Sequence, residues 1–330
     1  MIPFKAMILA AGLGTRLRPL TLGRPKVLMP VQNRPLLHWL LDYLRGAGAE
    51  GVILNAHHLS EVLAAHLASH DLGIPVQVRV ERALLGTGGG IRNVADFWDD
   101  RPFVVMNGDI LSAIDLQGVI RGHLRSRAVA TLVLTDEPWF NQVQVGADGR
   151  VVRFKDGPPD TSLAFTGIQV VSPEVLDVIP PQGASSIIQS YERLIAVGRR
   201  VMAHVVRGEY WRELGEVTRY LAVHQEFSRF GYSPIPGLQA GPGAIIHPSA
   251  RMGKRVRLAG TVCIGADCEV AEGATVEESI LWDRVQVGPG CSVWNSIIGD
   301  GVELRESVRD TVVVAERESA RQDRRITYNG

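Results

Sequence analysis

The residues of this chain that are best suited to chemistry lie directly after its first apolar stretch. Residues 6–10, AMILA, predict a short buried strand, and residues 9–26, LAAGLGTRLRPLTLGRPK, continue it with Gly12, Gly14 and four cations. Glycine lets backbone N–H groups approach a ligand closely, and cations attract anions. The loop therefore predicts a local binding site for an anionic group such as phosphate.

Two common phosphate-binding motifs do not match this loop. A Walker A loop requires G-x-x-x-x-G-K-[ST], a string that the sequence lacks. The dinucleotide fingerprint G-x-G-x-x-G accepts Gly12 and Gly14 but meets Leu17 where its last glycine belongs. What remains is a Gly-Leu-Gly-Thr-Arg turn that ends at Arg16, with Lys26 ten residues after that arginine.

Length and composition limit the classes of protein to consider. The chain has 330 residues, which is long enough for two domains, and it carries 35 Lys plus Arg against 35 Asp plus Glu. Without an excess of one charge, we expect neither a nucleic-acid partner nor a membrane partner. No apolar run approaches the ~20 residues that span a bilayer, and no signal peptide is recognisable. The three cysteines lack the spacing of a zinc or C-x-x-C motif, so we expect a cytoplasmic protein.

The loop belongs to a segment in which short apolar strands alternate with amphipathic helices, up to about residue 228. Strands are predicted over 52–54, 76–80, 103–106 and 130–134, and helices begin near residues 35 and 60. This alternation is typical of a mostly parallel sheet with helices on both faces. Asp109 follows the strand over 103–106, and open α/β sheets bind their ligands at such strand ends.

The last third of the chain has a different pattern. Residues 231–243, GYSPIPGLQAGPG, predict a linker, and beyond it apolar residues recur every six positions. The two tracks are Ala250, Val256, Val262, Cys268, Ala274, Ile280 and Met252, Leu258, Ile264, Val270, Val276, Trp282. A period of six predicts a β-helix with three hexads in a coil and about four coils, whose phase slips after Trp282. From about Ala315 we expect a helical or disordered tail, so the chain divides into residues 1–230, a linker at 231–243 and residues 244–330.

The loop resembles the signature of the sugar-phosphate nucleotidylyltransferases. That signature begins G-x-G-T-R-L-x-P-L-T and continues to P-K-x-L-x-P, and residues 12–21 and 25–30 reproduce both parts with their spacing. The resemblance implies an α/β catalytic domain, a Rossmann-like mostly parallel sheet of the glycosyltransferase-A kind, over residues 1–230. The six-residue period is similar to the left-handed parallel β-helix of hexapeptide repeats that several members carry, mannose 1-phosphate guanylyltransferases among them.

The predicted β-helix also has a predicted role. Its flat faces and open ends are edges that another subunit usually covers, so we expect a homo-oligomer joined through this domain. Removing residues 240–330 is then expected to change the oligomeric state more than the chemistry of each site.

Four further segments extend the resemblance over nearly all of residues 5–225. They are residues 81–93 (ERALLGTGGGIRN), 103–109 (FVVMNGD), 165–173 (FTGIQVVSP) and 210–221 (YWRELGEVTRYL). Carried over position by position, the resemblance implies nucleotide-binding residues at Leu9, Ala11, Gly12, Gly14, Thr15, Arg16, Glu81, Gly86 and Thr87. The implied sugar-phosphate site consists of Lys26, Asn107, Thr166 and Gly167, the implied metal ligands are Asp109 and Glu213, and the implied catalytic residues are Arg16, Lys26 and Asp109.

The implied reaction joins a nucleoside triphosphate to a sugar 1-phosphate and releases pyrophosphate. In-line attack on the α-phosphorus gathers negative charge, so the protein must supply cations, Mg²⁺ and positioning rather than covalent chemistry. Arg16 and Lys26 are expected to hold the two anions, and Asp109 is expected to ligate Mg²⁺. GTP and UTP are both favoured. L-G-T at 85–87 resembles the guanylyl branch, whereas T-G-G-G at 87–90 and F-x-G at 165–167 also resemble a branch that uses UTP and N-acetylmuramate 1-phosphate. T-G-G is also similar to heptose 1-phosphate guanylyltransferases.

Three departures from the family pattern motivate an alternative. Gly157 stands where the F-x-E-K-P segment carries its sugar-phosphate lysine, Phe165-Thr166-Gly167 replaces N-A-G, and Glu213 replaces an aspartate. A pocket can keep its binding after losing its chemistry, so the alternative is a catalytically weak or inactive regulatory subunit that binds an NDP-sugar. His66 and His70, four residues apart, also invite a metal site. No carboxylate or cysteine completes a ligand set with them, so we interpret them as helix-surface residues.

Overall fold

The structure is a computed structural model that describes residues 1–154, 162–230, 232–315 and 324–327. Its chain forms two compact units, which are taken one at a time. Met1–Leu13 and Leu37–Trp211 make the first unit, and Gly14–Leu36 and Arg212–Gly330 make the second. From Gly14 onward the signature loop therefore belongs to the unit that contains the C-terminal part of the chain, although in sequence it lies inside the predicted domain of residues 1–230.

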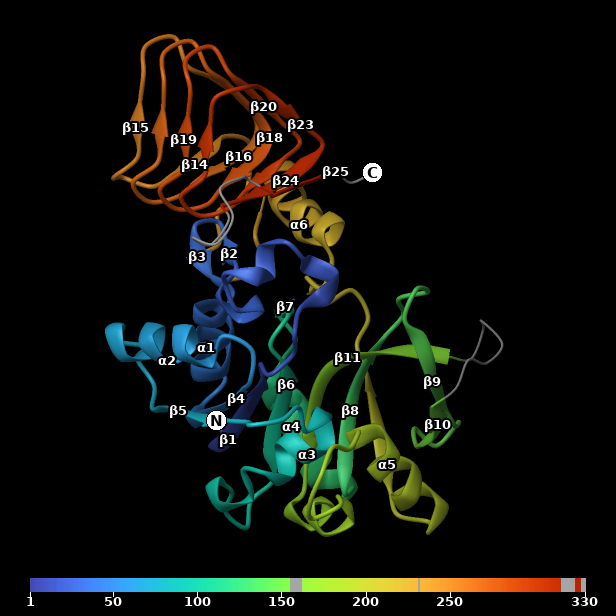
Figure 1. The fold of residues 1–330 in the computed structure, drawn as a ribbon. Helices are drawn as coiled ribbons and strands as arrows, with labels where there is room; N and C mark the ends of the chain where they lie inside the picture. Colours follow the sequence, from blue (N-terminus) through green and yellow to red (C-terminus); the bar gives the residue numbers. More distant parts are fainter. Residues whose placement is uncertain (155–161, 231, 316–323, 328–330) are drawn as a thin grey trace. The chain divides into compact units, whose positions relative to one another are not determined.

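A mixed sheet forms the centre of the first unit (Figure 1). In the part of the chain that the structure describes, nine strands form it, in the order β10-β9-β11-β6-β1-β4-β5, with β8 between β11 and β12. Their bounds are β1 Phe4–Leu9, β4 Ala49–Ala56, β5 Val76–Val80, β6 Phe103–Asn107, β8 Ala130–Thr135, β9 Asn141–Val145, β10 Val151–Phe154, β11 Ser162–Val171 and β12 Val201–Val205. β1 pairs in parallel with β4 and β6, and β4 with β5, as the alternation predicted. β11 is antiparallel to β6, β8 and β9, so the sheet is mixed where we expected a mostly parallel one.

Amphipathic helices connect these strands. The α-helices are α1 Leu36–Gly46, α2 Ser60–Ser69, α3 Gly86–Arg92, α4 Leu116–Ser126 and α5 Ile187–Ala196. The 3-10 helices are η4 Ala95–Phe97 and η6 Pro173–Val178, and two further short strands are β7 Ile110–Ser112 and β13 Trp211–Glu213. The leucines whose helical spacing predicted α1 are all buried. They are Leu36, Leu37, Leu40 and Leu44. No helix in the described residues is long and apolar enough to cross a bilayer.

In the second unit, residues 14–36 fold as a series of short turns. These are the 3-10 helices η1 Thr15–Leu17, η2 Leu20–Leu22 and η3 Lys26–Leu28, followed by a hairpin of β2 Pro30–Val31 and β3 Arg34–Pro35. Leu17, Leu20 and Leu28 are buried, so apolar side chains anchor the turns that carry Arg16 and Lys26. The helix α6, Val217–Arg229, belongs to the same unit.

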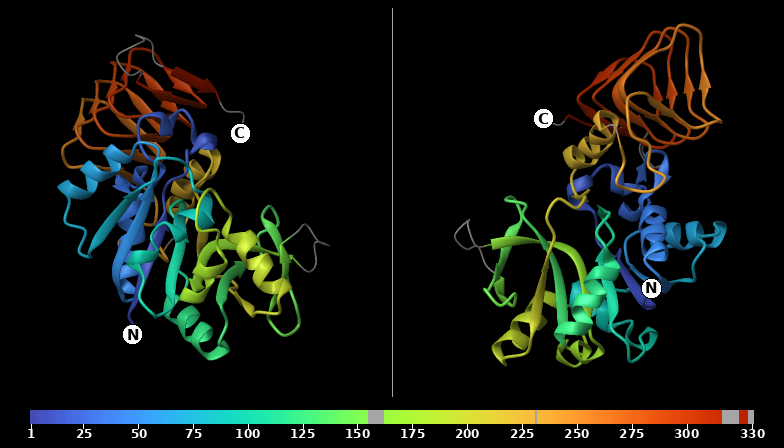
Figure 2. Two further views of the ribbon diagram at one scale, coloured as in Figure 1. Left: turned by 60° about the horizontal axis from the view of Figure 1, so that its bottom comes forward. Right: turned by 180° about the vertical axis from the view of Figure 1, so that it is seen from behind.

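Parallel strands are stacked in the rest of the second unit, and Figure 2 shows this stack from two further sides. One set consists of β14 Ala244–Ile246, β16 Arg257–Ile264, β18 Thr275–Leu281, β21 Ile297–Ile298 and β24 Thr311–Val314, and β20 Ser292–Trp294 and β23 Val308–Arg309 extend it. A second set consists of β15 Arg251–Met252, β17 Glu269–Val270, β19 Gln286–Val287 and β22 Glu303–Leu304. Their apolar side chains, among them Val262, Val270 and Val287, share one buried core.

The six-residue pattern predicts the spacing of these strands, but the predicted position of the phase slip is wrong. Leu258 pairs with Val276, eighteen residues on, which equals three hexads, whereas Val262 pairs with Ser279, seventeen residues on. The register therefore changes within β18, before Trp282 rather than after it. Successive side chains of a strand point to opposite faces, so Leu281 occupies the core in place of the expected Ile280 and Trp282.

The end of the described chain also differs from the expected tail. Residues 324–327 form strand β25, Arg324–Thr327, which pairs antiparallel with β24. The charged residues that motivated the tail prediction, from Glu316 to Arg321, lie outside the described residues.

Candidate active site

Three cations converge on one carboxylate in the second unit. Oε1 of Glu213 lies 3.1 Å from Nη2 of Arg16 and 4.0 Å from Nζ of Lys26, and its Oε2 lies 2.8 Å from Nη1 of Arg219. Arg16 also donates from Nη1 to Oε1 of Glu216 at 2.9 Å. The side chains of Glu213 and Lys26 are only 10% and 16% exposed, whereas the side chain of Arg16 is 54% exposed, so the central carboxylate is largely withdrawn from water and the guanidinium of Arg16 faces solvent. We call these five residues the cation cluster.

Two glycines make the cation cluster possible. Gly14 has a φ of +60°, and a Cβ there would lie 2.7 Å from Cγ2 of Thr21, whose hydroxyl donates to the Gly14 carbonyl. At Gly215, a Cβ would lie 1.8 Å from Oε1 of Glu213 and 2.8 Å from Nη2 of Arg16. Any side chain at position 215 would therefore separate the carboxylate from the guanidinium.

The chemistry of the cation cluster suits a phosphate. Arg16, Lys26 and Arg219 carry three positive charges, and Glu213 and Glu216 carry two negative ones. A guanidinium presents a planar set of donors that matches phosphate oxygens, while a lysine contributes a compact point charge. The sequence motif identified Arg16 and Lys26, and the structure brings both to Glu213.

In the first unit, the predicted sugar-phosphate residues Asn107 and Gly167 are in contact. Asn107 ends β6, and Gly167 lies on β11, the antiparallel neighbour of β6. Gly167 has a φ of +78°, and a Cβ there would lie 2.5 Å from Nδ2 of Asn107. Asp109 follows β6 with a half-buried side chain, and the intervening Gly108 donates its N–H to the carbonyl of Leu9 at the end of β1. Asn107 and Asp109 thus lie two residues apart at the end of β6, and their roles stay predictions.

Thr166, predicted to bind the sugar phosphate, is directed into the sheet. It is 1% exposed, and its hydroxyl donates to the carbonyl of Val133 at 2.8 Å and accepts from the N–H of Ile168. Its own carbonyl accepts from Nε1 of Trp211 at 2.9 Å. The Thr166 side chain therefore stabilises the irregular stretch of β11, and a ligand could contact only the backbone beside it.

Glu81, predicted to contact the nucleotide, is instead an internal connector. It is 3% exposed, and its carboxylate accepts from Nδ2 of Asn55 at 2.8 Å and from the N–H of Leu85 at 3.1 Å. Asn55 in turn accepts from the N–H of Ala10, next to the end of β1. This buried bridge fixes the start of α3 against the strand ends. Asn55, a polar residue directly after the strand predicted over 52–54, was the missed signal.

The remaining predicted nucleotide-binding residues divide into exposed and internal ones. Thr87 accepts at its hydroxyl from the N–H of Ile187, and a Cβ at Gly86 would lie 2.6 Å from the carbonyl of Ser185, so both fasten α3 to the start of α5. Gly12 and Thr15 are exposed, and Ala11 is buried.

The structure also bears on the predicted metal ligands, and one of the altered segments lies outside its described residues. Glu213 was expected to ligate a metal, but here both its carboxylate oxygens are engaged by cations. Within the described ranges, no group of three or more His, Cys, Asp or Glu side chains is arranged to hold a metal ion, and this includes the neighbourhood of His66 and His70. The altered residues from Lys155 to Pro158, with Gly157 among them, lie outside the described residues.

Sequence reasoning named Arg212 and Arg219 only as alternative surface partners of Glu213, and it missed Glu216. Arg219 and Glu216 lie in and just before the first turn of α6, within the segment 210–221 that the family pattern singled out. The only available signal was their spacing from Glu213, since residues at positions 213, 216 and 219 are three apart. Arg212, which had been the other candidate partner of Glu213, pairs with Glu226.

Comparison with known proteins matches a family model to each of the two parts of the chain. A family model described as nucleotidyl transferase matches residues 5–229, and one described as GMPPB C-terminal domain matches residues 241–327. The mannose-1-phosphate guanylyltransferase of Mycobacterium tuberculosis is 33% identical over 296 residues, covering 87% of this chain and 82% of that protein. The N-acetylmuramate alpha-1-phosphate uridylyltransferase of Caulobacter vibrioides is 32% identical over 234 residues, covering 67% of this chain and 95% of that protein.

A solved structure shares the fold. The crystal structure of HddC from Yersinia pseudotuberculosis matches with a TM-score of 0.60 at 23% identity, covering 68% of this chain and 99% of that one.

Proposed function

Because this chain belongs to the nucleotidyl transferase family, we propose that it joins a nucleoside triphosphate to a sugar 1-phosphate, giving an NDP-sugar and pyrophosphate. The observation that carries the proposal is the cation cluster, in which Arg16 and Lys26 of the signature loop lie beside Arg219. A site for two phosphate-bearing substrates needs several cations in fixed positions, and this group supplies them.

The reaction requires positioning above all. An oxygen of the sugar phosphate attacks the α-phosphorus of the triphosphate, a new P–O bond forms, and the bond to pyrophosphate breaks. Both reactants are anions, so cations are needed to let them approach and to stabilise the leaving group. We assign that role to Arg16 and Lys26, whose turns are anchored by buried leucines.

We assign Mg²⁺ to Asp109. The fit rests on donor chemistry, because Mg²⁺ prefers oxygen ligands and commonly takes one or two carboxylates together with phosphate oxygens and water. Asp109 offers a half-buried carboxylate at a strand end. Bound there, the ion would neutralise charge on the phosphates. Glu213 fits less well as it stands, since its three nearest charged partners are cations that would repel a further cation. Its metal role remains a prediction.

GTP and UTP remain the favoured triphosphates. The relatives named above use a guanylyl group in one case and a uridylyl group in the other. The match of residues 241–327 to the GMPPB C-terminal domain supports GTP with mannose 1-phosphate as the first pair to test.

We also propose that the stacked strands form a left-handed β-helix that joins subunits in a homo-oligomer. The parallel pairing of successive coils and the buried valine core support a β-helix. The three cysteines are free buried thiols, which supports a reducing compartment such as the cytoplasm.

The test is pyrophosphate release by the full chain with Mg²⁺. GTP, UTP, dTTP, ATP and CTP are each offered with mannose, glucose, N-acetylmuramate and heptose 1-phosphates. Turnover with at least one pair, and with GTP or UTP above the others, is the expected result. A folded protein that is inactive with every pair would overturn the proposal.

A regulatory subunit is the second candidate, because both oxygens of Glu213 are engaged by cations. It predicts NDP-sugar binding in calorimetry without turnover. Pyrophosphate release by the purified chain excludes it.

A further inference from the structure

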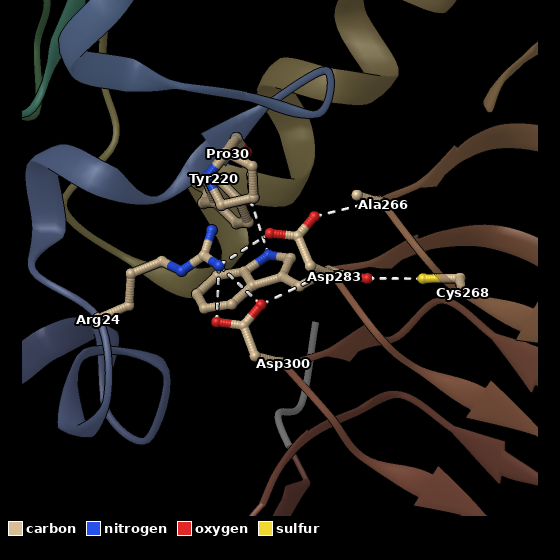
Figure 3. Close-up of polar contacts among 8 residues, drawn as sticks. Arg24, Pro30, Tyr220, Ala266, Cys268, Asp283 and Asp300 are labelled. Atoms are coloured by element: carbon tan, nitrogen blue, oxygen red, sulfur yellow. Dashed lines mark hydrogen bonds and ion pairs between the residues drawn. The ribbon is translucent and has the colours of Figure 1, made fainter. Parts of the chain in front are cut away.

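Arg24, a cation of the signature loop, contacts the stacked strands. Its Nη2 lies 3.0 Å from Oδ2 of Asp283 and 2.7 Å from the carboxylate of Asp300, and its guanidinium lies over the ring of Trp282, 5.0 Å from the centroid (Figure 3). The Arg24 side chain is 17% exposed. Two carboxylates and an aromatic face therefore hold this arginine.

The two carboxylates are themselves fixed by the backbone of the stack. Asp283 accepts at Oδ1 from the N–H of Ala266, and Asp300 accepts at Oδ1 from the N–H of Asp283. Burial raises the pKa of Asp300 above its ordinary value, against the opposing effect of Arg24. Without the arginine, two neighbouring acids would face each other with poor access to water.

A second connection holds the loop on the other side of Lys26. Trp282 donates from Nε1 to the hydroxyl of Tyr220 at 3.1 Å, and that hydroxyl donates to the carbonyl of Pro30. Tyr220 is fully buried on α6, and Figure 3 draws it together with Pro30 and the residues of the stack. A little further along the loop, Nδ2 of Asn33 donates to the carbonyl of Ile264 at 2.7 Å.

Lys26 lies between these two connections. Arg24 precedes it by two residues and Pro30 follows it by four, and the turn between them is closed by the N–H of Leu28 to Pro25 and of Met29 to Lys26. A lysine on a flexible stem is useful only if its backbone is held.

We propose that Arg24 is a positioning residue, which holds the turn of Lys26 in place by binding Asp283 and Asp300 of the stacked strands. The stack is then part of the catalytic machinery as well as a module for assembly. The role in catalysis rests on the proposed function. The structural part, that the stack orders the loop, stands without it.

The experiment compares Arg24→Gln with Arg255→Gln in the full chain. Arg255 forms an ion pair with Glu272 in the same stack, but it is 81% exposed and lies far from the loop in sequence, so it is a matched control. Each variant is measured for kcat and KM, for thermal unfolding, and for hydrogen exchange of the Leu28 and Met29 amides, all well below the unfolding temperature.

We expect Arg24→Gln to lower kcat/KM by ~10- to 100-fold and to speed exchange at Leu28 and Met29, with Arg255→Gln within about twofold of wild type. Arg24→Lys should recover part of the loss, because it keeps the charge but not the planar fork. If Arg24→Gln does not fold, Asp283→Asn takes its place, since Asp300 still pairs with Arg24, and it should show a smaller change of the same kind.

Several results would overturn the proposal. They are unchanged kcat/KM in a folded Arg24→Gln variant, an equal loss in Arg255→Gln, and a loss of activity without faster exchange at Leu28 and Met29. If wild type itself releases no pyrophosphate, the proposed function fails, and the exchange measurement alone still decides whether Arg24 orders the loop.

Discussion

Glu213 and Arg219 form the shortest ion pair of the cation cluster, with Oε2 of Glu213 2.8 Å from Nη1 of Arg219. The remaining oxygen of Glu213 faces Arg16 and Lys26. A residue at the position of a family metal ligand thus serves here to gather three cations. The roles of Glu213 as an organiser of cations and as a metal ligand make different predictions.

Glu213→Gln removes the charge that gathers the cations while keeping the size of the side chain. We expect KM for at least one substrate to rise several-fold, because Arg16 and Arg219 lose their shared partner. The Mg²⁺ concentration that gives half-maximal activity should stay the same. A titration of activity against Mg²⁺ measures this. A marked rise in the Mg²⁺ requirement would instead make Glu213 a metal ligand, as the sequence predicted.

Arg219→Gln tests whether the third cation binds a phosphate. A hydrogen bond to a charged group contributes ~1.5–3 kcal/mol, so we expect KM for the triphosphate or the sugar phosphate to rise by ~10- to 100-fold. Arg212→Gln is the matched control, since Arg212 is seven residues away on the same segment and pairs with Glu226. Equal kinetics in the two variants would remove Arg219 from the site.

Asp109→Asn removes the carboxylate that we assign to Mg²⁺. We expect kcat to fall by at least ~100-fold, because the phosphates lose the metal charge that stabilises the transition state. Nucleotide binding in the presence of EDTA should change little. Asp148→Asn, at an exposed acid paired with Arg150, is the control and should leave kcat unchanged. Substantial activity in Asp109→Asn would refute the assignment.

Buried histidines give the protein a pH dependence of stability. His224 accepts at Nε2 from the N–H of Gln32, its Nδ1 contacts the carbonyl of Tyr220, and burial lowers its pKa from 6.5 to about 4. Burial likewise lowers the pKa of His123 to about 4. Below pH 6.5 these histidines are protonated in the unfolded chain, whereas in the folded chain they stay neutral until about pH 4. Their full contribution to the free energy of unfolding is therefore present only above pH 6.5.

The expected loss on acidification follows from this sign. Between pH 7 and pH 5 the free energy of unfolding should fall by about 2 kcal/mol for His224 alone, measured by urea unfolding at both pH values. His224→Gln should flatten this slope, whereas His247→Gln, at a partly exposed position, should not. An unaltered slope in His224→Gln would contradict the prediction.

Features of the fold and of the candidate site that depend on local patterns could be predicted from the amino-acid sequence. The signature loop pointed to Arg16 and Lys26 because its glycines, prolines and cations are contiguous. The family match over residues 5–229 confirms the family resemblance that the loop suggested. Alternating strands and helices predicted the parallel pairing of β1 with β4 and β6. The six-residue period predicted the eighteen-residue spacing of β15 and β17, whereas β17 and β19 pair seventeen residues apart and β20 and β23 fifteen.

The ion pairs between residues far apart in the sequence could be identified only once the fold was known. Glu213 meets Arg16 across nearly two hundred residues, and Arg24 meets Asp300 across more than that, and no local pattern records such pairs. These contacts also change our expectation for removing residues 240–330, which we now expect to impair catalysis as well as assembly. The direction of the Trp282 side chain likewise depends on the fold. A one-residue change of register turned its side chain from the core of the stacked strands toward Tyr220, where it is still buried, because side-chain direction alternates along a strand.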